Sequence, residues 1–428
     1  MKPVLQLALD FVDLKRALKV AREAVEGGVD WLEAGTPLIK SEGLDAVRAL
    51  RKEFPRHTIV ADMKIMDAGR TEVEAAAKAG ANIVDVLGAA SDATIRECIE
   101  AGRNYGAEII VDTIAVDKVN ERAREVEKMG AQYVSVHIAI DEQMLAVEPF
   151  DKLGEVAKTV RIPIAVAGGI NSETAATAVK AGASIIVVGG AISKARDARK
   201  AAEEIKRAIR TRTGVKTDLY KRVSLPDIRK VLRKVSTSNL SDALHRRGDL
   251  KGLKPITQGI KMVGPAVTVR TYPGDWAKPV EAIDQAQEGE VIVIDAGGVG
   301  PAVWGELATH SSLQKKLSGV VIDGAVRDTQ EIRKLKFPAF SRLIMPTAGE
   351  PKGFGEVGTP VKVGEVKINP GDWIVGDDDG VVAIPGEKVV EFTNRAMDVL
   401  EKENRIRKEI EEGSTLSSVT ELLRWEKH

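Results

Sequence analysis

Apolar segments alternate with amphipathic segments from residue 4 to about residue 190. The apolar segments are almost uniformly hydrophobic, which is typical of parallel strands that are buried on both faces. Eight such segments occur, at residues 4–10, 29–35, 58–64, 82–88, 107–113, 132–138, 163–169 and 184–190. Each is followed by a helical pattern, and several of these helical segments end in Ala-Gly or Met-Gly before the next strand. Eight β-α units of this length predict a (β/α)8 TIM barrel.

The pattern changes after a basic helical stretch at residues 196–222. Strands punctuated by glycine and proline then predominate, and a long charged helix is expected over residues 387–413. A chain of 428 residues also exceeds the ~250–300 residues that a single core supports. We therefore predict an α/β protein with two domains, a barrel over residues 1–212 and a sheet-rich α/β domain over 213–428 that includes the C-terminal helix.

Composition narrows the function classes. Acidic and basic residues are equal at 63 each, so overall charge gives no reason to expect binding to nucleic acid or to an anionic membrane. The single cysteine, Cys98, lies in a helical pattern and is expected to be a packing residue. No segment approaches the ~18–20 apolar residues of a membrane span, and the N-terminus lacks a secretory pattern, so we expect a cytoplasmic protein.

Polar residues gather where the predicted barrel strands end, and in a barrel these ends meet at one face. They are Asp10, Glu33, Asp62, Lys64, Asp85, Asp112 and His137. Carboxylates converging from adjacent strands suit a hard divalent cation such as Mg²⁺ or Mn²⁺. Asp62 and Lys64, two residues apart, point to the same side of a strand, where they either neutralise each other or serve a charged substrate.

Two further features lie at the same face. His137 adds a group that titrates near neutral pH, although a single histidine on a strand is also compatible with a packing role. Glycine pairs follow the seventh and eighth strands, where barrels commonly bind phosphate through backbone amides. These are Gly168 with Gly169 and Gly189 with Gly190. A single pair indicates only a tight turn, whereas two pairs at these strands favour a phosphate site.

The segments LQLALD, WLEAGTPLIKSEG, ADMKIMDAG, VHIAIDEQ, VAGGI and VVGGAI together resemble the 3-hexulose-6-phosphate synthases of the orotidine 5'-phosphate decarboxylase superfamily. The resemblance implies an aldol addition of formaldehyde to ribulose 5-phosphate, with Mg²⁺ as cofactor. It implies that Glu33 and Asp62 hold the metal and that Asp10 binds substrate hydroxyls. It also implies that Lys64 and His137 carry protons and stabilise the developing oxyanion.

The same resemblance implies that the barrel forms a dimer in which Asp67 reaches the neighbouring active site. The alternative within this superfamily is a 3-keto-L-gulonate-6-phosphate decarboxylase, which usually has an arginine after the glycine of strand eight. This chain has Gly190 at that position, which favours the synthase.

Three motifs of the second domain carry candidate chemistry. In residues 320–328 a strand ends in Arg327 and Asp328, which suit a carboxylate or keto oxygen and a cation respectively. Residues 291–310 form a strand, a glycine-rich loop and a helix start, an arrangement that can receive an anion. Residues 371–385 place three aspartates at a turn, and we expect these to have a turn role.

With SNLSDALHRRG and MVGPAVTVRTYPGD, these motifs resemble the RraA family over about residues 223–390. That family contains ribonuclease regulators and class II aldolases. Its aldolase branch implies that Arg327 binds an oxo-acid and Asp328 a metal, that Gly305, Glu306, Leu307 and Ala308 supply carboxylate-binding amides, and that Glu306 lies near the metal's waters. It also implies oxaloacetate decarboxylation and trimeric assembly. The alternative is a non-catalytic regulator or an oligomerisation module.

Overall fold

The computed structural model describes residues 2–218 and 220–420, and the chain divides into two compact units. The first contains Met1–Arg222 together with the chain from Glu401 onward, and the second is Val223–Leu400. The first unit therefore ends after Arg222 and not after residue 212. The last part of the chain also belongs with the first unit, and not with the second domain as the sequence pattern predicts.

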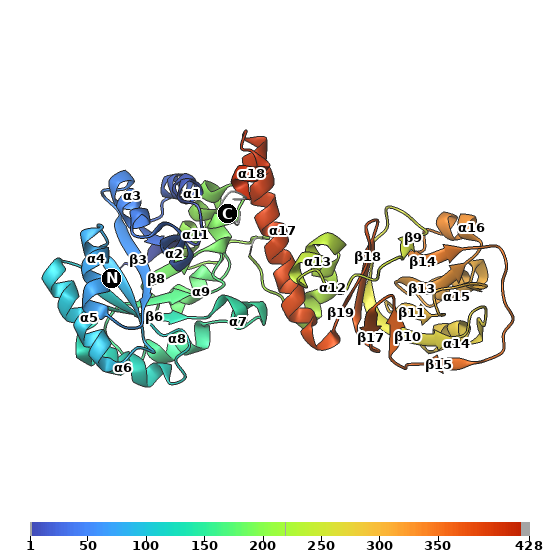
Figure 1. Ribbon diagram of the computed structural model, residues 1–428. Helices are drawn as coiled ribbons and strands as arrows, with labels where there is room; N and C mark the ends of the chain where they lie inside the picture. Colours follow the sequence, from blue (N-terminus) through green and yellow to red (C-terminus); the bar gives the residue numbers. More distant parts are fainter. Residues whose placement is uncertain (1, 219, 421–428) are drawn as a thin grey trace. The chain divides into compact units, whose positions relative to one another are not determined.

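The first unit is a closed barrel of eight parallel strands in sequential order, which confirms the predicted fold (Figure 1). The strands are β1 (Val4–Leu9), β2 (Trp31–Ala34), β3 (Thr58–Ile65), β4 (Ile83–Leu87), β5 (Glu108–Asp112), β6 (Tyr133–His137), β7 (Ile164–Ala167) and β8 (Ile185–Val188). Register pairs such as Leu7 with Leu32 and Leu5 with Ile186 close the ring.

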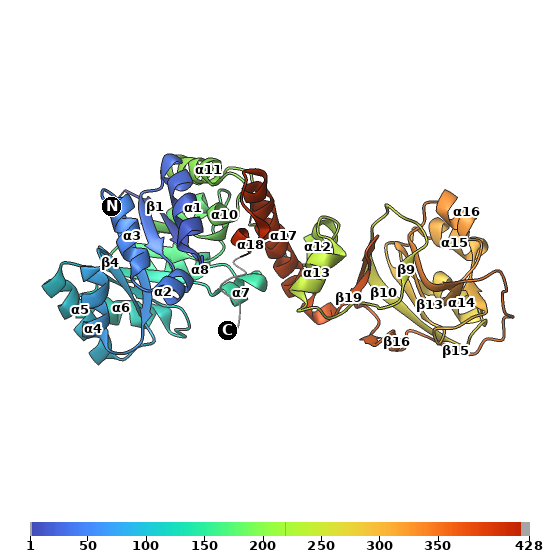
Figure 2. The same cartoon turned by 45° about the horizontal axis from the view of Figure 1, so that its top comes forward.

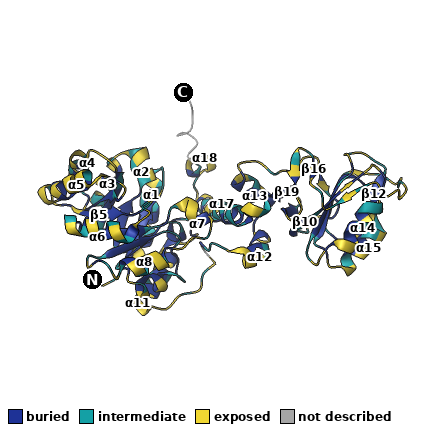
Figure 3. Cartoon of the chain, turned by 90° about the horizontal axis from the view of Figure 1, so that it is seen from below, coloured by how far each residue is buried: buried dark blue, intermediate teal, exposed yellow. Residues whose placement is uncertain are grey.

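Helices surround this barrel and turn their apolar faces to it, so that buried positions line the inside and exposed positions the outside (Figure 3). They are α1 (Leu14–Glu26), α2 (Thr36–Glu42), α3 (Asp45–Glu53), α4 (Gly69–Lys78), α5 (Asp92–Tyr105), α6 (Val119–Met129), α7 (Ile140–Met144), α8 (Phe150–Val156), α9 (Ala175–Lys180), α10 (Gly190–Ser193) and α11 (Ala198–Thr211). Cys98 is fully buried in α5, and burial raises the pKa of its thiol to about 12, as expected for a packing residue.

The inner face of the barrel explains where the polar residues lie. A cluster of apolar side chains fills the barrel interior: Ala8, Trp31, Val60, Ile83, Ile110, Ala165, Ala167, Ile185 and Val187. Side chains alternate between the two faces of a strand, so a residue two positions further along points to the same face. Asp10, Glu33, Asp62, Asp85 and Asp112 each follow one of these apolar residues by two positions and therefore stand above the apolar layer.

The chain from Glu401 is held in the first unit by ion pairs. It contains the end of α17 (Val389–Glu411) and α18 (Leu416–Val419). The buried guanidinium of Arg405 donates two hydrogen bonds of 2.8 Å to Glu23 and one of 2.9 Å to Glu409. Glu409 also pairs with Arg16 at 3.0 Å. A periodic charged helix does not reveal which domain carries its partners, and for this reason the sequence assigned the segment wrongly.

The second unit is built on a mixed sheet with the order β19-β18-β10-β11-β13-β14-β9, to which β12 and β15 add at the side, and a separate hairpin of β16 and β17. Its strands are β9 (Lys254–Pro255), β10 (Met262–Thr271), β11 (Val291–Asp295), β12 (Ala302–Trp304), β13 (Gly319–Val326), β14 (Ala339–Ile344), β15 (Gly355–Val357), β16 (Val361–Val363), β17 (Val366–Ile368), β18 (Trp373–Asp377) and β19 (Gly380–Ile384). The central strands β10, β11, β13 and β14 are parallel. The expected α/β domain with a sheet-rich core is confirmed.

The helices of this unit are α12 (Ile228–Leu232), α13 (Thr237–Ala243), α14 (Ala277–Gln285), α15 (Glu306–Gln314), α16 (Thr329–Lys334) and the first part of α17, with short 3-10 turns at Leu225–Asp227 and Gly386–Lys388. Figure 2 shows α14, α15 and α16 beside the parallel strands. The three aspartates at residues 377–379 lie where β18 turns into β19. There Asp377 accepts the N–H of Thr237 at 2.8 Å, at the start of α13, and Asp378 accepts the N–H of Gly259 at 2.8 Å, in the loop before β10.

Candidate active site

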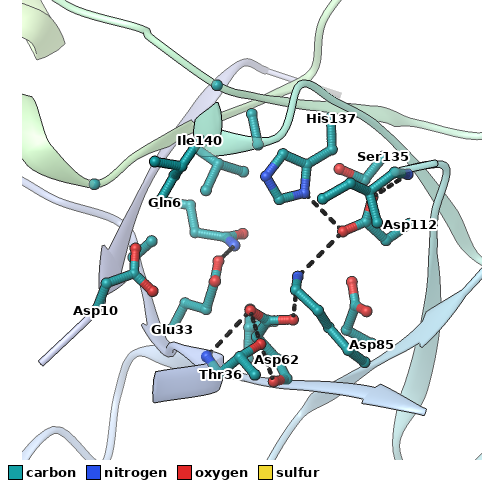
Figure 4. A pocket seen from close by; sticks show the side chains of 18 of the residues that line it. Gln6, Asp10, Glu33, Thr36, Asp62, Asp85, Asp112, Ser135, His137 and Ile140 are labelled. Carbon is teal, nitrogen blue, oxygen red and sulfur yellow. Dashed lines mark hydrogen bonds and ion pairs between the residues drawn. The ribbon is translucent and has the colours of Figure 1, made fainter. Parts of the chain in front are cut away.

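A cavity of about 490 Å³ opens at the carboxyl ends of the barrel strands, and all eight strands contribute to its lining. Figure 4 shows its side chains pointing toward a shared centre. Nine of the residues predicted from the sequence line it: Asp10, Glu33, Asp62, Lys64, His137, Gly168, Gly169, Gly189 and Gly190. The structure therefore brings the predicted barrel residues together, with the exception of Asp67.

Glu33 and Asp62 form the acidic side of the cavity. Glu33 is buried and accepts a hydrogen bond from the side chain of Gln6. Burial, followed by the negative charges of Asp62 and Asp10, raises the pKa of Glu33 well above its usual range. Asp62 is oriented by Thr36, whose hydroxyl donates to Oδ2 at 2.6 Å and whose N–H donates at 3.2 Å.

Lys64 occupies the centre of the cavity in an unusual backbone conformation. Its φ of 47° lies in the left-handed region, at a register irregularity between β3 and β4. Such a conformation costs a non-glycine residue on the order of 1–3 kcal/mol, and this kind of strain is concentrated at functional sites. The ammonium lies 3.0 Å from Asp62 and 3.4 Å from Asp112. Burial lowers its pKa, but the charges of Asp62, Asp85 and Asp112 outweigh this and raise the pKa, so Lys64 is held protonated.

His137 and Asp112 form a hydrogen-bonded pair. Nδ1 of His137 lies 2.7 Å from Oδ2 of Asp112, and the N–H of Ile114 donates to the other carboxylate oxygen at 2.9 Å. Burial opposes ionisation of Asp112, but the charge and hydrogen bond of His137, followed by the charge of Lys64, lower its pKa. An ionised Asp112 accepts the Nδ1 proton of a neutral imidazole and leaves Nε2 as the basic nitrogen.

Three further polar residues line this cavity: Gln6, Asp85 and Asp112. The sequence pattern indicates the position of the two aspartates but not their roles, and it does not indicate Gln6. Asp85 is buried, and burial, followed by the charges of Asp112 and Asp62, raises its pKa well above the usual range. Its Oδ1 and the Oε1 of Gln6 have no hydrogen-bond partner among the described residues. Asp112 is the partner of His137. The strand-end pattern identified both aspartates, but Gln6 lies in the middle of a strand and gave no such signal.

Tyr220 also lines the cavity, although it lies beyond the predicted barrel. Its ring packs on Gly190, where a Cβ would collide with it. Asn171 donates to its carbonyl at 3.2 Å, its own N–H donates to Glu401 at 2.5 Å, and the guanidinium of Arg222 stacks 4.0 Å from its ring centroid. No pattern in the sequence predicted this residue, because it lies in an irregular segment after the last barrel helix.

Asp67 is exposed and does not line the cavity of its own chain. Neighbouring Met66 is also exposed, at 55%. That Asp67 contributes to the active site of a second subunit therefore stays a prediction.

The donors of the cavity fit a divalent cation. In the described part of the chain, no three carboxylate, imidazole or thiol groups are arranged to hold a metal ion by themselves. Glu33 and Asp62 are nevertheless two oxygen donors that repel each other strongly enough to shift a pKa, which is a condition that a cation relieves. The remaining ligands of such an ion would come from substrate and water.

The residues predicted in the second unit also meet, but on its surface. Nε of Arg327 lies 3.4 Å from Oδ2 of Asp328, which accepts the N–H of Glu306 at 3.2 Å. A Cβ on Gly305 would lie 2.5 Å from the same carboxylate. The side chains of Arg327 and Asp328 are 44% and 38% exposed, and Leu307 is 79% exposed. These three side chains are therefore open to solvent, whereas Ala308 is turned partly toward the core.

In the described part of the chain, no helix combines the length and the hydropathy that a membrane crossing requires.

Comparison with known proteins identifies relatives of each part. Residues 3–205 match the model of the orotidine 5'-phosphate decarboxylase / HUMPS family, and residues 237–383 match the RraA-like model, described as Aldolase/RraA. A 3-hexulose-6-phosphate synthase of Mycobacterium gastri is 42% identical over 207 residues, which are 48% of this chain and 99% of that protein. The synthase of Bacillus subtilis (strain 168) is 38% identical over 206 residues, 48% of this chain and 98% of that protein.

Solved structures include a 3-hexulose-6-phosphate synthase from Salmonella typhimurium, with 37% identity, a TM-score of 0.48, and coverage of 49% of this chain and 99% of that one. The RNA-processing inhibitor RraA from Thermus thermophilis is 30% identical, with a TM-score of 0.33 and coverage of 35% of this chain and 92% of that one.

Proposed function

Because the chain belongs to the orotidine 5'-phosphate decarboxylase / HUMPS family through its barrel, we propose that it catalyses the aldol addition of formaldehyde to D-ribulose 5-phosphate. The product is D-arabino-hex-3-ulose 6-phosphate, and the reverse reaction releases formaldehyde. The observation that supports this proposal best is the pairing of a basic imidazole, His137 held by Asp112, with the protonated Lys64 in one cavity.

In this proposal His137 moves the proton. Nε2 removes a proton from C1 of ribulose 5-phosphate, because Nδ1 is already committed to Asp112. The electrons left on C1 form the new bond to the carbon of formaldehyde. The oxygen of formaldehyde becomes negative in this step and receives a proton, which His137 can return.

Lys64 acts by charge. A side chain held protonated by three carboxylates cannot accept the substrate proton, but it can stabilise a negative oxygen at C2 of the sugar. Glu33 and Asp62 would hold a Mg²⁺ ion, which would supply further positive charge to stabilise developing negative charge in the cavity. Asp10, which is open to the cavity, is placed to accept hydrogen bonds from substrate hydroxyls.

The phosphate end of the substrate is proposed to lie against the glycines that follow β7 and β8. Tyr220 supports the synthase against the related decarboxylase, because its ring fills the space that an arginine at position 190 would need. This aromatic wall lies outside residues 3–205, the part of the chain that matches the family model.

The test of this proposal is the Mg²⁺-dependent consumption of formaldehyde in the presence of ribulose 5-phosphate, with the full-length chain and its Asp62→Asn variant. We expect Asp62→Asn to lower kcat/KM by about 10²–10³-fold, since it removes a preorganised charge at the reacting oxygens. Asp45→Asn, at an aspartate that is 76% exposed on the outer surface, is the matched control and should be unaffected. Equal activity of the two variants would show that the assignment is wrong.

For the second unit we propose a metal-dependent oxo-acid aldolase or decarboxylase with Arg327 as the carboxylate binder and Asp328 as the metal ligand. The contact of Arg327, Asp328 and the N–H of Glu306 in one exposed group supports this proposal over an oligomerisation module. A non-catalytic regulator would keep the same residues, so turnover of an oxo-acid is the property that separates it from the enzyme.

The discriminating measurement is pyruvate formation from oxaloacetate and Mg²⁺ by the full-length chain. Arg327→Ala should reduce the rate to that of the metal alone. Arg270→Ala, at an arginine of the same unit that is 55% exposed, should leave it unchanged. A wild-type rate no higher than the metal background would favour the non-catalytic alternative.

A further inference from the structure

A second cavity, of about 570 Å³, lies at the edge of the sheet in the second unit. The loops that lead into β10, β11, β13 and β14 form it, together with helix α12. These strands are parallel, so their amino ends share one edge of the sheet. Arg327 and Asp328 follow the carboxyl end of β13, so this cavity is separate from the proposed oxo-acid site.

Basic side chains dominate its lining. We call these five residues the basic cavity: Arg229, Arg233, Lys261, Lys316 and Lys336. A single carboxylate, that of Glu288, lines it with them. Since the chain carries equal numbers of acidic and basic residues, this local excess of cations does not result from overall composition.

Carboxylates of the protein neutralise only part of the positive charge of the basic cavity. Glu288 pairs with Lys316 at 3.3 Å, and Lys261 lies 3.5 Å from Asp377. Among the described residues, the other three cations of the basic cavity form no ion pair with a carboxylate. The basic cavity therefore has a net positive charge that the fold itself does not balance.

Arg229 forms the fixed part of the basic cavity. Its Nη1 donates to the carbonyls of Gly289 at 2.8 Å and Val263 at 3.0 Å, and to the hydroxyl of Ser318 at 3.1 Å. A Cβ on Gly289 would lie 2.7 Å from Nη1 and 2.9 Å from Nη2, so a glycine is needed for this approach. These contacts orient the guanidinium through one nitrogen, and the ring of Trp373 lies against it, with its centroid 5.6 Å from Cζ. Among the described residues, Nη2 has no hydrogen-bond partner, so it can donate to a ligand.

The electrostatic state of these groups favours the binding of an anion. Burial, followed by the charge of Arg233, lowers the pKa of Arg229. Burial also lowers the pKa of Lys261 in spite of its proximity to Asp377. Like charges brought together without a counterion destabilise a fold, and an anion placed between them removes this cost.

We propose that the basic cavity binds a small organic anion that carries two phosphate groups, or a diphosphate. Arg229 and Lys261 contact the inner phosphate, and Arg233, Lys316 and Lys336 surround the outer one. Guanidinium groups suit phosphate because their parallel N–H donors match two of its oxygens.

Size and shape favour a small ligand over nucleic acid. The volume is within the ~300–1,000 Å³ that is usual for small-molecule sites. Nucleic acid is bound by basic residues spread along a track that follows the backbone, often with aromatic side chains for base stacking. Here the cations converge in one hollow, and no aromatic residue is among those that line it.

The test is isothermal titration of the full-length protein with inorganic pyrophosphate in metal-free buffer, with inorganic phosphate and a single-stranded RNA as comparison ligands. The cavity variant is Arg233→Gln with Lys336→Gln, since both side chains are exposed and their loss should not disturb folding. The matched control is Lys230→Gln with Lys334→Gln, which removes the same charge from exposed neighbours outside the cavity. Ribulose 5-phosphate is added in a separate arm, because the barrel is proposed to bind a sugar phosphate.

We expect pyrophosphate to bind more tightly than phosphate, with about tenfold weakening in the cavity variant, as for the loss of charge-assisted hydrogen bonds. The control variant and added ribulose 5-phosphate should leave the affinity unchanged. Equal weakening in both variants would show non-specific attraction, and displacement by ribulose 5-phosphate would show binding in the barrel. Either result, tighter binding of the RNA, or no pyrophosphate binding at millimolar concentration would overturn the proposal.

Discussion

The two candidate catalytic sites differ in how far the protein encloses their charged side chains. In the barrel, eight strands surround the charged groups, Glu33 and Asp85 are buried, and burial together with neighbouring charge shifts their pKa values. In the second unit, Arg327 and Asp328 lie in the open, at 44% and 38% exposure. Charges act more strongly when water is excluded, so the charged groups of the barrel cavity should influence a bound ligand more strongly than the exposed Arg327 and Asp328 do.

One feature is common to both. Lys64 and Asp328 each adopt a left-handed backbone conformation, with φ of 47° and 56°, at the end of a parallel strand. Local strain of this kind is found where a side chain must be aimed in a direction that a regular strand does not allow.

The largest effect should come from His137 in the enclosed site. His137→Ala should lower kcat by about 10²–10⁴-fold, the usual contribution of a general base, with little change in the KM of ribulose 5-phosphate. Asp112→Asn should cause a smaller loss, because it removes the partner that selects the tautomer. Steady-state kinetics at several pH values measures both. If His137→Ala retains normal kcat, the barrel contains a different base.

Substitution of Asp67 tests whether one chain supplies every residue of the barrel's active site. If it serves the neighbouring subunit, Asp67→Ala and His137→Ala should each be nearly inactive, by roughly 10²-fold or more. Mixing the two variants should then restore about a quarter of the wild-type activity, because mixed dimers contain one intact site. No recovery on mixing, with Asp67→Ala active alone, would show that each barrel works by itself.

Tyr220 should affect binding more than chemistry. Tyr220→Ala removes the wall over Gly190 and should raise the KM for ribulose 5-phosphate about tenfold, while kcat and the KM for formaldehyde change little. Tyr220→Phe keeps the ring on Gly190 and should behave like the wild type. A lower KM in Tyr220→Ala would instead mean that the tyrosine obstructs the substrate.

The smallest expected effect is on the Tm. Its increase on Mg²⁺ binding should depend on pH, because the metal and a proton compete for Glu33. The pKa of Glu33 is raised in the folded state, so the contribution of this group to stability falls as pH rises from its unfolded pKa to its folded pKa. A Mg²⁺ ion bound to the Glu33 carboxylate would have to displace the same proton. The Tm increase caused by Mg²⁺, expected to be a few degrees at about 100 times Kd, should therefore be larger at pH 8 than at pH 5.5.

Scanning calorimetry of the wild type and of Glu33→Gln measures this shift. The variant has no ionisable group at this position and should lose most of the Mg²⁺ effect together with its dependence on pH. A shift that is the same at both pH values, or that persists in the variant, would place the metal elsewhere.

The barrel was predictable because buried parallel strands leave long apolar segments, and its site because polar residues stand at their ends. Glu33, Asp62 and His137 could be identified in this way. Gln6 was missed because nothing distinguishes a polar residue inside a strand from a surface one. Tyr220 and the packing of Arg405 depend on contacts between segments distant in the sequence, for which spacing carries no information.

The most direct test of the central proposal is to follow ¹³C-labelled formaldehyde by NMR with the full-length protein, ribulose 5-phosphate and Mg²⁺. We expect the label to appear as the C1 hydroxymethyl group of a hexulose 6-phosphate, and this signal to be lost in His137→Ala. Labelled formaldehyde that stays unchanged with the wild-type protein would contradict the proposal.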